Sequence, residues 1–199
     1  MKNNGKNNGK GIKEVVERIE QEELKSLLRR GEKFSLERNF ERAKNEYEEA
    51  LEIARKKGIV DGELICLYYI GDILYHQEKT GEKDCFPLAI EHLDEVSAVL
   101  KSEYRLKDLR YDLNWKSKAL RELAVKNFYY LLRSYLFCKN SFLATEALHD
   151  LAAVSFSLQK VKEMLVQKLG GDQAASLMQG LHIIRDSQWT SGRIETETG

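Results

Sequence analysis

The residues best suited to metal chemistry are Glu146 and His149, which form a Glu-x-x-His pair. On a helix this spacing places a carboxylate and an imidazole on one face, and carboxylate-bridged di-iron bundles use two such pairs together with further glutamates. This chain has no second pair, because none of the other histidines, His76, His92 and His182, follows a glutamate by three positions. We therefore expect no metal site and no cofactor.

Nucleophilic catalysis is not indicated either. The sequence contains none of the motifs G-x-x-x-x-G-K, G-x-G-x-x-G, G-x-S-x-G and H-E-x-x-H, which bind phosphates, expose a nucleophile or hold a catalytic zinc. Ser134 and Ser155 fall inside expected helices, where a hydroxyl lacks a neighbouring base to activate it. These observations predict a protein that is not an enzyme.

A mixture of basic and aromatic residues between positions 104 and 121 offers a different chemistry. Such mixtures bind single-stranded nucleic acids through phosphate contacts and base stacking. Acidic residues are interspersed here and reduce the local positive charge, and the whole chain has 32 basic and 32 acidic residues. Nucleic-acid binding by this helical face is therefore the alternative function, and we rank it below protein binding. Its basic and aromatic residues are Tyr104, Arg105, Lys107, Arg110, Tyr111, Trp115, Lys116, Lys118 and Arg121.

Composition predicts a water-soluble helical protein. The chain has 199 residues, 42% of them hydrophobic and 32% charged, and its only proline is Pro87. No apolar run is long enough to cross a bilayer, and the N-terminus lacks the hydrophobic stretch of a secretion signal. We expect a cytoplasmic location and no membrane partner. The three cysteines, Cys66, Cys85 and Cys138, are widely spaced, which argues against a disulfide framework, and we expect each to be a buried apolar residue.

Apolar residues recur at helical spacing along most of the chain and predict an all-α fold of about seven helices. Residues 1–11 are rich in Asn, Gly and Lys and are expected to be disordered, residues 12–188 to form a single helical domain, and residues 189–199 to be a polar tail. The first helix is expected to run from Ile12 to about Leu36. Asn39 and Gly58 bound the second helix, and Asn114 is the only candidate break between residues 103 and 139.

Residues 24–57 show a more specific pattern. Leu27, Gly31 and Phe34 lie on one helical face, and Ala43, Tyr47 and Ala50 lie on the face of the next helix. This pattern resembles the tetratricopeptide repeat family, whose small residues let two antiparallel helices approach closely. Looser copies lie at residues 64–100 and 125–157, and Leu132 replaces the packing glycine in the last, which is expected to push its helices apart. The resemblance implies tetratricopeptide-like hairpins over residues 24–101 and a bundle of longer helices over residues 103–188.

A heptad-like seam follows in the C-terminal half. Its apolar residues alternate at spacings of four and three between residues 147 and 165. Packing of this seam within the monomer is the interpretation that we favour, and a homodimer through the same face is the alternative. The seam consists of Ala147, Leu151, Val154, Leu158, Val161 and Leu165.

The resemblance also implies a function. In such repeats the first helix of each hairpin lines a concave groove that binds a peptide or helix of a partner protein. We therefore predict a protein-binding adaptor or subunit of a larger complex. With Gly31, Gly71 and Leu132 as register marks, the groove-lining residues are Lys25, Leu28, Glu32, Ile65, Tyr68, Asp72, Tyr75, Lys126, Tyr129 and Arg133. The alternative for Tyr68 and Tyr129 is that they belong to the core.

Overall fold

The computed structural model describes residues 10–79, 86–155 and 158–179. These residues form ten helices joined by turns, rather than about seven, and the described segments contain no strand, which confirms the all-α prediction. The expected disordered segment lies outside the described residues except for Lys10 and Gly11, which belong to a helix, and the expected tail at 189–199 lies outside them altogether. The helices are α1 (Lys10–Glu17), α2 (Glu22–Leu36), α3 (Phe40–Lys57), α4 (Val60–Lys79), α5 (Phe86–Glu103), α6 (Leu106–Tyr111), α7 (Trp115–Phe137), α8 (Ser141–Val154), α9 (Leu158–Leu169) and a last helix over residues 171–179.

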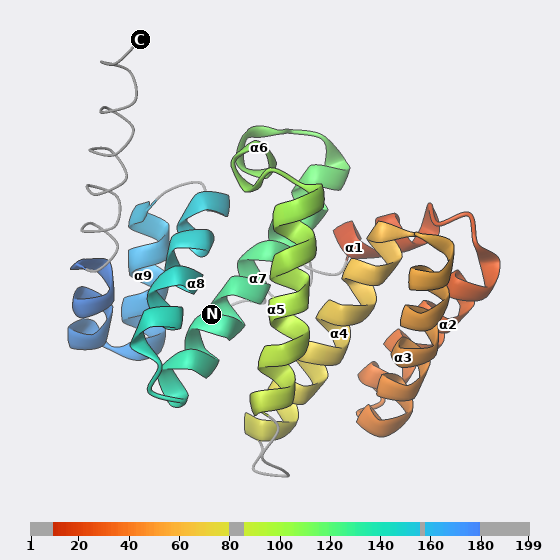
Figure 1. The fold of residues 1–199 in the computed structure, drawn as a ribbon, viewed down its shortest axis with the longest axis horizontal. Coiled ribbons are helices and arrows are strands. Elements are labelled where there is room, and N and C mark those ends of the chain that lie inside the picture. Colours follow the sequence, from red (N-terminus) through yellow and green to blue (C-terminus); the bar gives the residue numbers. More distant parts are fainter. Residues whose placement is uncertain (1–9, 80–85, 156–157, 180–199) are drawn as a thin grey trace, which may run out of the picture.

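Helices that are neighbours in sequence pack against each other in pairs. The most extensive contacts join α2 to α3, α4 to α5 and α7 to α8, and each pair then stacks on the next through α3 with α4 and α5 with α7 (Figure 1). The helix α7 therefore continues the row of paired helices past residue 103, and the short α6 lies against α7 and α8. One continuous hydrophobic core results from this stacking.

Two glycines set the close approach within the first two helix pairs. A Cβ atom on Gly31 would lie 2.6 Å from Cε1 of Tyr47, and one on Gly71 would lie 2.7 Å from Cδ2 of Leu93. A methyl group at either position would force a neighbouring side chain to shift, so glycine lets α2 pack closely on α3 and α4 pack closely on α5. The predicted contact of a small residue with a large one is thus present in both pairs.

The third helix pair uses the same turn as the first. Arg38 and Lys139 have positive φ angles of 59° and 56°, and the asparagine after each accepts a hydrogen bond from the backbone N–H three residues on. The backbone bonds that close the two turns also match: the asparagine N–H donates to the carbonyl of Phe34 in the first and of Tyr135 in the second. A single constant shift in numbering relates all these positions, so the turn at residues 134–143 repeats the geometry of the turn at residues 33–42.

Leu132 does not separate α7 from α8, contrary to our expectation. The two helices pack as extensively as α2 and α3 do, and Leu132 is fully buried. The residue at the position of Tyr47 is Leu148, which is also fully buried and much smaller. A leucine pair therefore fills the space that a glycine and a tyrosine fill in the first pair.

The N-terminal helix departs from the prediction. The expected helix from Ile12 to Leu36 is broken after Glu17, and α2 begins at Glu22 with the side chain of Gln21 accepting a hydrogen bond from the N–H of Glu23. Acidic residues in the first turn of α2 also favour a helix start at this point. The break lets α1 turn back and pack on α7, with smaller contacts to α2 and α4 (Figure 1).

The heptad-like seam is not one helix. The helix α8 ends at Val154 and α9 begins at Leu158, so residues 147–165 cannot form a continuous coiled-coil face. The seam residues with described side chains, Ala147, Leu151, Val154, Val161 and Leu165, are buried within the chain. Packing within the monomer, the interpretation that we favour, thus accounts for the pattern of these residues.

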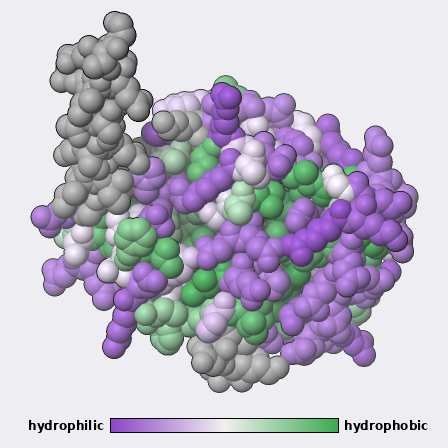
Figure 2. Space-filling view, viewed as in Figure 1, coloured by the Kyte–Doolittle hydropathy of each residue, from purple (hydrophilic) through white to green (hydrophobic). Residues whose placement is uncertain are grey.

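The face of the molecule drawn in Figure 2 is mostly polar. Hydrophilic residues cover most of the face shown in Figure 2, with hydrophobic residues in smaller areas between them. Among the described residues, no helix combines the length and the apolar character needed to cross a bilayer.

Candidate functional site

The candidate site is the inner face, by which we mean the sides of α2, α4 and α7 that share contacts with one another and with α1. These three are the first helices of the helix pairs, so the inner face corresponds to the surface that the sequence pattern assigned to binding. Its two parts differ. The part near the start of α7 carries α1, and the part near the ends of α4 and α7 carries a cluster of tyrosines.

Apolar side chains attach α1 to the inner face. Ile12, Val15, Val16 and Ile19 recur at helical spacing and are all buried. A Cβ atom on Gly11 would lie 3.1 Å from Cβ of Ala119, so the backbone of α1 comes close to α7 at this point. An isolated helix shorter than about 12–15 residues is marginal in water, and packing on the inner face must therefore stabilise α1.

Charged groups fix the orientation of α1. Lys13 Nζ lies 2.8 Å from a carboxylate oxygen of Glu32, and the Arg29 guanidinium donates two hydrogen bonds to the Glu17 carboxylate. These bonds lower the pKa of Glu17 and raise that of Arg29, although both groups are exposed. On the other side, the Arg18 guanidinium lies 4.0 Å from the ring centre of Trp115, a cation–π contact. The helix α1 is thus held by opposite charges on α2 and by an aromatic ring on α7.

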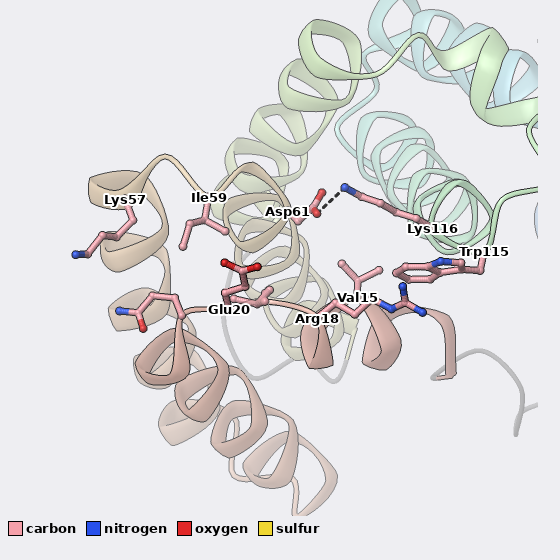
Figure 3. A pocket seen from close by; sticks show the side chains of 10 residues that line it. Val15, Arg18, Glu20, Lys57, Ile59, Asp61, Trp115 and Lys116 are labelled. Atoms are coloured by element: carbon pink, nitrogen blue, oxygen red, sulfur yellow. Dashed lines mark ion pairs between the residues drawn. The ribbon is translucent and has the colours of Figure 1, made fainter.

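A pocket of about 620 Å³ lies where the end of α1 meets the start of α4 and the start of α7 (Figure 3). Lys116 on α7 forms an ion pair with Asp61 on α4 across it, with Nζ and Oδ2 2.7 Å apart. Tyr104 also donates to Asp61 at 2.5 Å. The pocket is open to solvent and contains both signs of charge, so it shows no preference for an anionic or a cationic ligand.

The second part of the inner face is an aromatic cluster. The rings of Tyr75 on α4 and Tyr130 on α7 stack with centroids 4.3 Å apart, and His76 meets the Tyr130 ring edge-on. Tyr129 and Arg133 lie beside them, with Arg133 Nη1 3.5 Å from the Tyr129 hydroxyl. The stacking fixes the rings on two rigid helices before any partner arrives. We call Tyr68, Asp72, Tyr75, His76, Tyr129, Tyr130 and Arg133 the tyrosine cluster.

Polar contacts link the side chains of this cluster. The Tyr130 hydroxyl lies 3.5 Å from Nε2 of His76, and this nitrogen lies 3.5 Å from Oδ1 of Asp72. Burial is the largest cause of the raised pKa of Tyr68, Tyr75 and Tyr130. The hydroxyls therefore remain protonated near neutral pH and act as neutral hydrogen-bonding groups. Tyrosines of this kind suit recognition better than proton transfer, because a general base works best with a pKa near the working pH.

The ten residues predicted to line the groove divide into two sets. Leu28, Ile65, Tyr68 and Tyr75 are almost fully buried, at 2%, 1%, 2% and 4% exposure, and so belong to the core rather than to an open surface. The other six are partly exposed: Lys25, Glu32, Asp72, Lys126, Tyr129 and Arg133. Two of these six are occupied by ion pairs, Lys25 with Glu22 and Glu32 with Lys13. The structure brings Asp72, Tyr129 and Arg133 together with Tyr68 and Tyr75.

Sequence reasoning missed α1, Tyr130 and His76 as parts of this site. The spacing of Ile12, Val15, Val16 and Ile19 was visible, but it was assigned to a continuation of the next helix. Tyr130 and His76 follow Tyr129 and Tyr75 directly. The prediction took one residue from each helical turn as groove-lining, so it left out the residue next to each of them. Bulky rings on two facing helices can nevertheless meet from such adjacent positions.

Three of the basic and aromatic residues of segment 104–121, Trp115, Lys116 and Arg121, contact other parts of the chain. Arg121 is buried and donates to the carbonyls of Leu109 and Arg110, while Trp115 is covered by Arg18. Lys116 pairs with Asp61, as described above. The contacts of these residues are with the chain itself, so the local structure gives little support to the nucleic-acid alternative.

Within the described residues, no three His, Cys, Asp or Glu side chains come close enough to hold a metal ion. Cys66 is buried as expected, whereas Cys138 is exposed at the end of α7, so the prediction for Cys138 was wrong; Cys85 lies outside the described residues.

Comparison with protein-family models, with curated proteins and with solved structures gave no match for this chain.

Proposed function

We propose that this chain is a tetratricopeptide-like adaptor, not an enzyme, and that it binds a peptide or helix of a partner protein on its inner face. Three features support the repeat assignment: the stacking order of the helix pairs, the glycine contacts of the first two pairs, and the matching turns of the first and third pairs. Such arrays present the first helix of each pair to a ligand.

The observation that carries the functional proposal is the tyrosine cluster. Tyr129, Tyr130 and Arg133 are partly exposed, lie on one side of α7 and are held by stacking and hydrogen bonds. Tyr and Arg are the residue types that most often dominate interface energetics, and rings that are already ordered lose little conformational entropy on binding. The cluster is therefore suited to hold a polypeptide with both apolar and polar groups.

A cytoplasmic location is part of the proposal. Cys66 and Cys138 are both free, and an exposed thiol such as that of Cys138 persists most readily in a reducing compartment.

The test compares capture of native partners by matched variants. The full chain, Tyr129→Ala, Arg133→Ala and Tyr111→Ala are immobilised and exposed to native lysate, and the captured proteins are quantified by mass spectrometry. Tyr111 is the control because it is 70% exposed and lies on α6, away from the inner face. We expect partners of the full chain to be retained by Tyr111→Ala and depleted about thirtyfold by the other two, the loss that truncation of a hot spot typically causes.

Equal capture by all four proteins would exclude the tyrosine cluster as the binding surface. Thermal melts accompany the assay. They must show that Tyr129→Ala and Arg133→Ala remain folded before a loss of capture is assigned to the site.

A further inference from the structure

The inner face already binds a helix, and that helix belongs to the same chain. We propose that α1 is a built-in ligand, and that the partner segment is an amphipathic helix of the same chemistry which displaces it. This inference rests on the proposed function, because it names the occupant of the same inner face.

The contacts of α1 specify what such a helix must contain. Aliphatic residues are needed at the spacing of Ile12, Val15 and Val16, that is, at positions i, i+3 and i+4, and Ile19 just past the end of the helix is also buried. A basic residue at i+1 meets Glu32, and an acidic residue at i+5 meets Arg29. Arg18, directly after the helix end, covers the ring of Trp115. The pattern combines an apolar stripe with charges on both flanks, which gives a partner helix a defined direction.

Displacement follows from the length of α1. With eight residues it is too short to be a stable helix alone, and it covers only the part of the inner face near Trp115. On α7, Tyr129, Tyr130 and Arg133 of the tyrosine cluster remain partly exposed. A longer partner helix that makes the contacts of α1 and extends along α7 from Ala119 toward Tyr129 gains contacts that α1 lacks.

Tethering works in favour of α1. Residues 18–21 join it directly to α2, and a short linker of this kind gives an effective concentration in the millimolar range. A ligand with only the contacts of α1 therefore competes poorly with it, and the inner face stays closed to weak or unspecific helices.

The first test uses a fluorescent peptide of residues 10–21, KGIKEVVERIEQ, and measures its binding to the full chain by anisotropy. In Ile12→Asp/Val16→Asp, two buried contacts of α1 are lost and the inner face is freed. Glu14→Ala is the matched control, because Glu14 is exposed and pairs only with Arg18 of the same segment. We expect the peptide to bind the double variant at least tenfold more tightly than the wild type or the control. Equal binding to all three proteins would overturn the proposal, and so would no binding to a double variant that melts cooperatively.

A charge exchange tests the site of binding. Adding Arg29→Glu to the double variant should weaken binding of the native peptide, and a peptide with Glu17→Arg should restore it. If the exchanged peptide binds no better than the native one, the peptide is not lying on α2 in the manner of α1, and the proposal fails.

If the double variant does not fold, displacement of α1 is tested in the wild-type protein instead. An excess of unlabelled peptide is added to ¹⁵N-labelled protein, and amide exchange of residues 12–19 is followed by NMR. We expect faster exchange as α1 is displaced, and unchanged exchange at millimolar peptide would refute displacement. The lysate assay with Tyr129→Ala is independent of these results. A loss of partners there together with a failure of the peptide tests would leave the adaptor function standing and remove only the built-in ligand.

Discussion

Gly31→Ala tests the close contact between α2 and α3. The added Cβ would lie 2.6, 2.7 and 2.9 Å from three ring atoms of Tyr47, whose side chain is completely buried. Tyr47 cannot move aside easily, because its ring stacks on Tyr69 with centroids 4.9 Å apart. Overpacking of this kind costs about 1–3 kcal/mol, and the rigid surroundings place this site near the upper limit.

Helix propensity acts in the opposite direction. Alanine is favoured over glycine inside a helix by about 1 kcal/mol, which leaves a net destabilisation of about 2 kcal/mol. For a chain of this size that value lowers the melting temperature by about 4–8 °C. Gly171→Ala is the control, because a Cβ there meets nothing within 4 Å and the φ angle is not positive. We expect Gly171→Ala to be neutral or slightly stabilising in thermal and urea unfolding. A Gly31→Ala protein as stable as the wild type would show that α2 and α3 are not held at the separation described.

Three further predictions concern the core, the pH dependence and the alternative function. Tyr68→Ala should lower the free energy of unfolding by about 3–5 kcal/mol, because it removes a buried ring. Tyr129→Ala should change it little, and urea unfolding of both variants measures the difference. Burial lowers the pKa of His92 in the folded protein. Below about pH 6.5 the unfolded chain therefore binds more protons than the folded one, and the free energy of unfolding should decrease as the pH falls further. In urea unfolding, His92→Gln should lose less stability than the wild type between about pH 7.5 and pH 5. Equal losses in the two proteins would show that His92 does not cause the pH dependence. In gel-shift titrations at near-physiological salt we expect no binding of single-stranded oligonucleotides, and a shift at low micromolar protein that Trp115→Ala abolishes would favour the nucleic-acid alternative.

Sequence reasoning predicted the elements that depend on local chemistry. Asn39 caps α3, Gly58 ends it with a positive φ of 66°, and Asn114 caps α7, all as expected from helix-capping preferences. The contact of Gly31 with Tyr47 was also predictable, because two residues of one hairpin are close in sequence and their sizes must match.

The elements that depend on distant contacts were harder to predict. The spacing of Ile12 to Ile19 shows an apolar face but does not say which helix covers it, and α1 packs on residues about a hundred positions away. In the same way, the seam between residues 147 and 165 was compatible with one long helix, and the break at Ser155 carries neither proline nor glycine to reveal it. The tyrosine cluster was found only in part, since rings on α4 and α7 meet across two helices and no single-helix register contains both.

The long separation between α1 and α7 also has a consequence for the order of folding. The pairs α2–α3, α4–α5 and α7–α8 form from residues close in sequence, so their loop-closure entropy is small, whereas docking of α1 requires the third pair to be in place. On the ribosome, α1 is synthesised before α7 and cannot dock until residues 115–137 have followed. The inner face therefore exists before α1 occupies it, and a nascent chain passes through a state in which that surface is open to other helices.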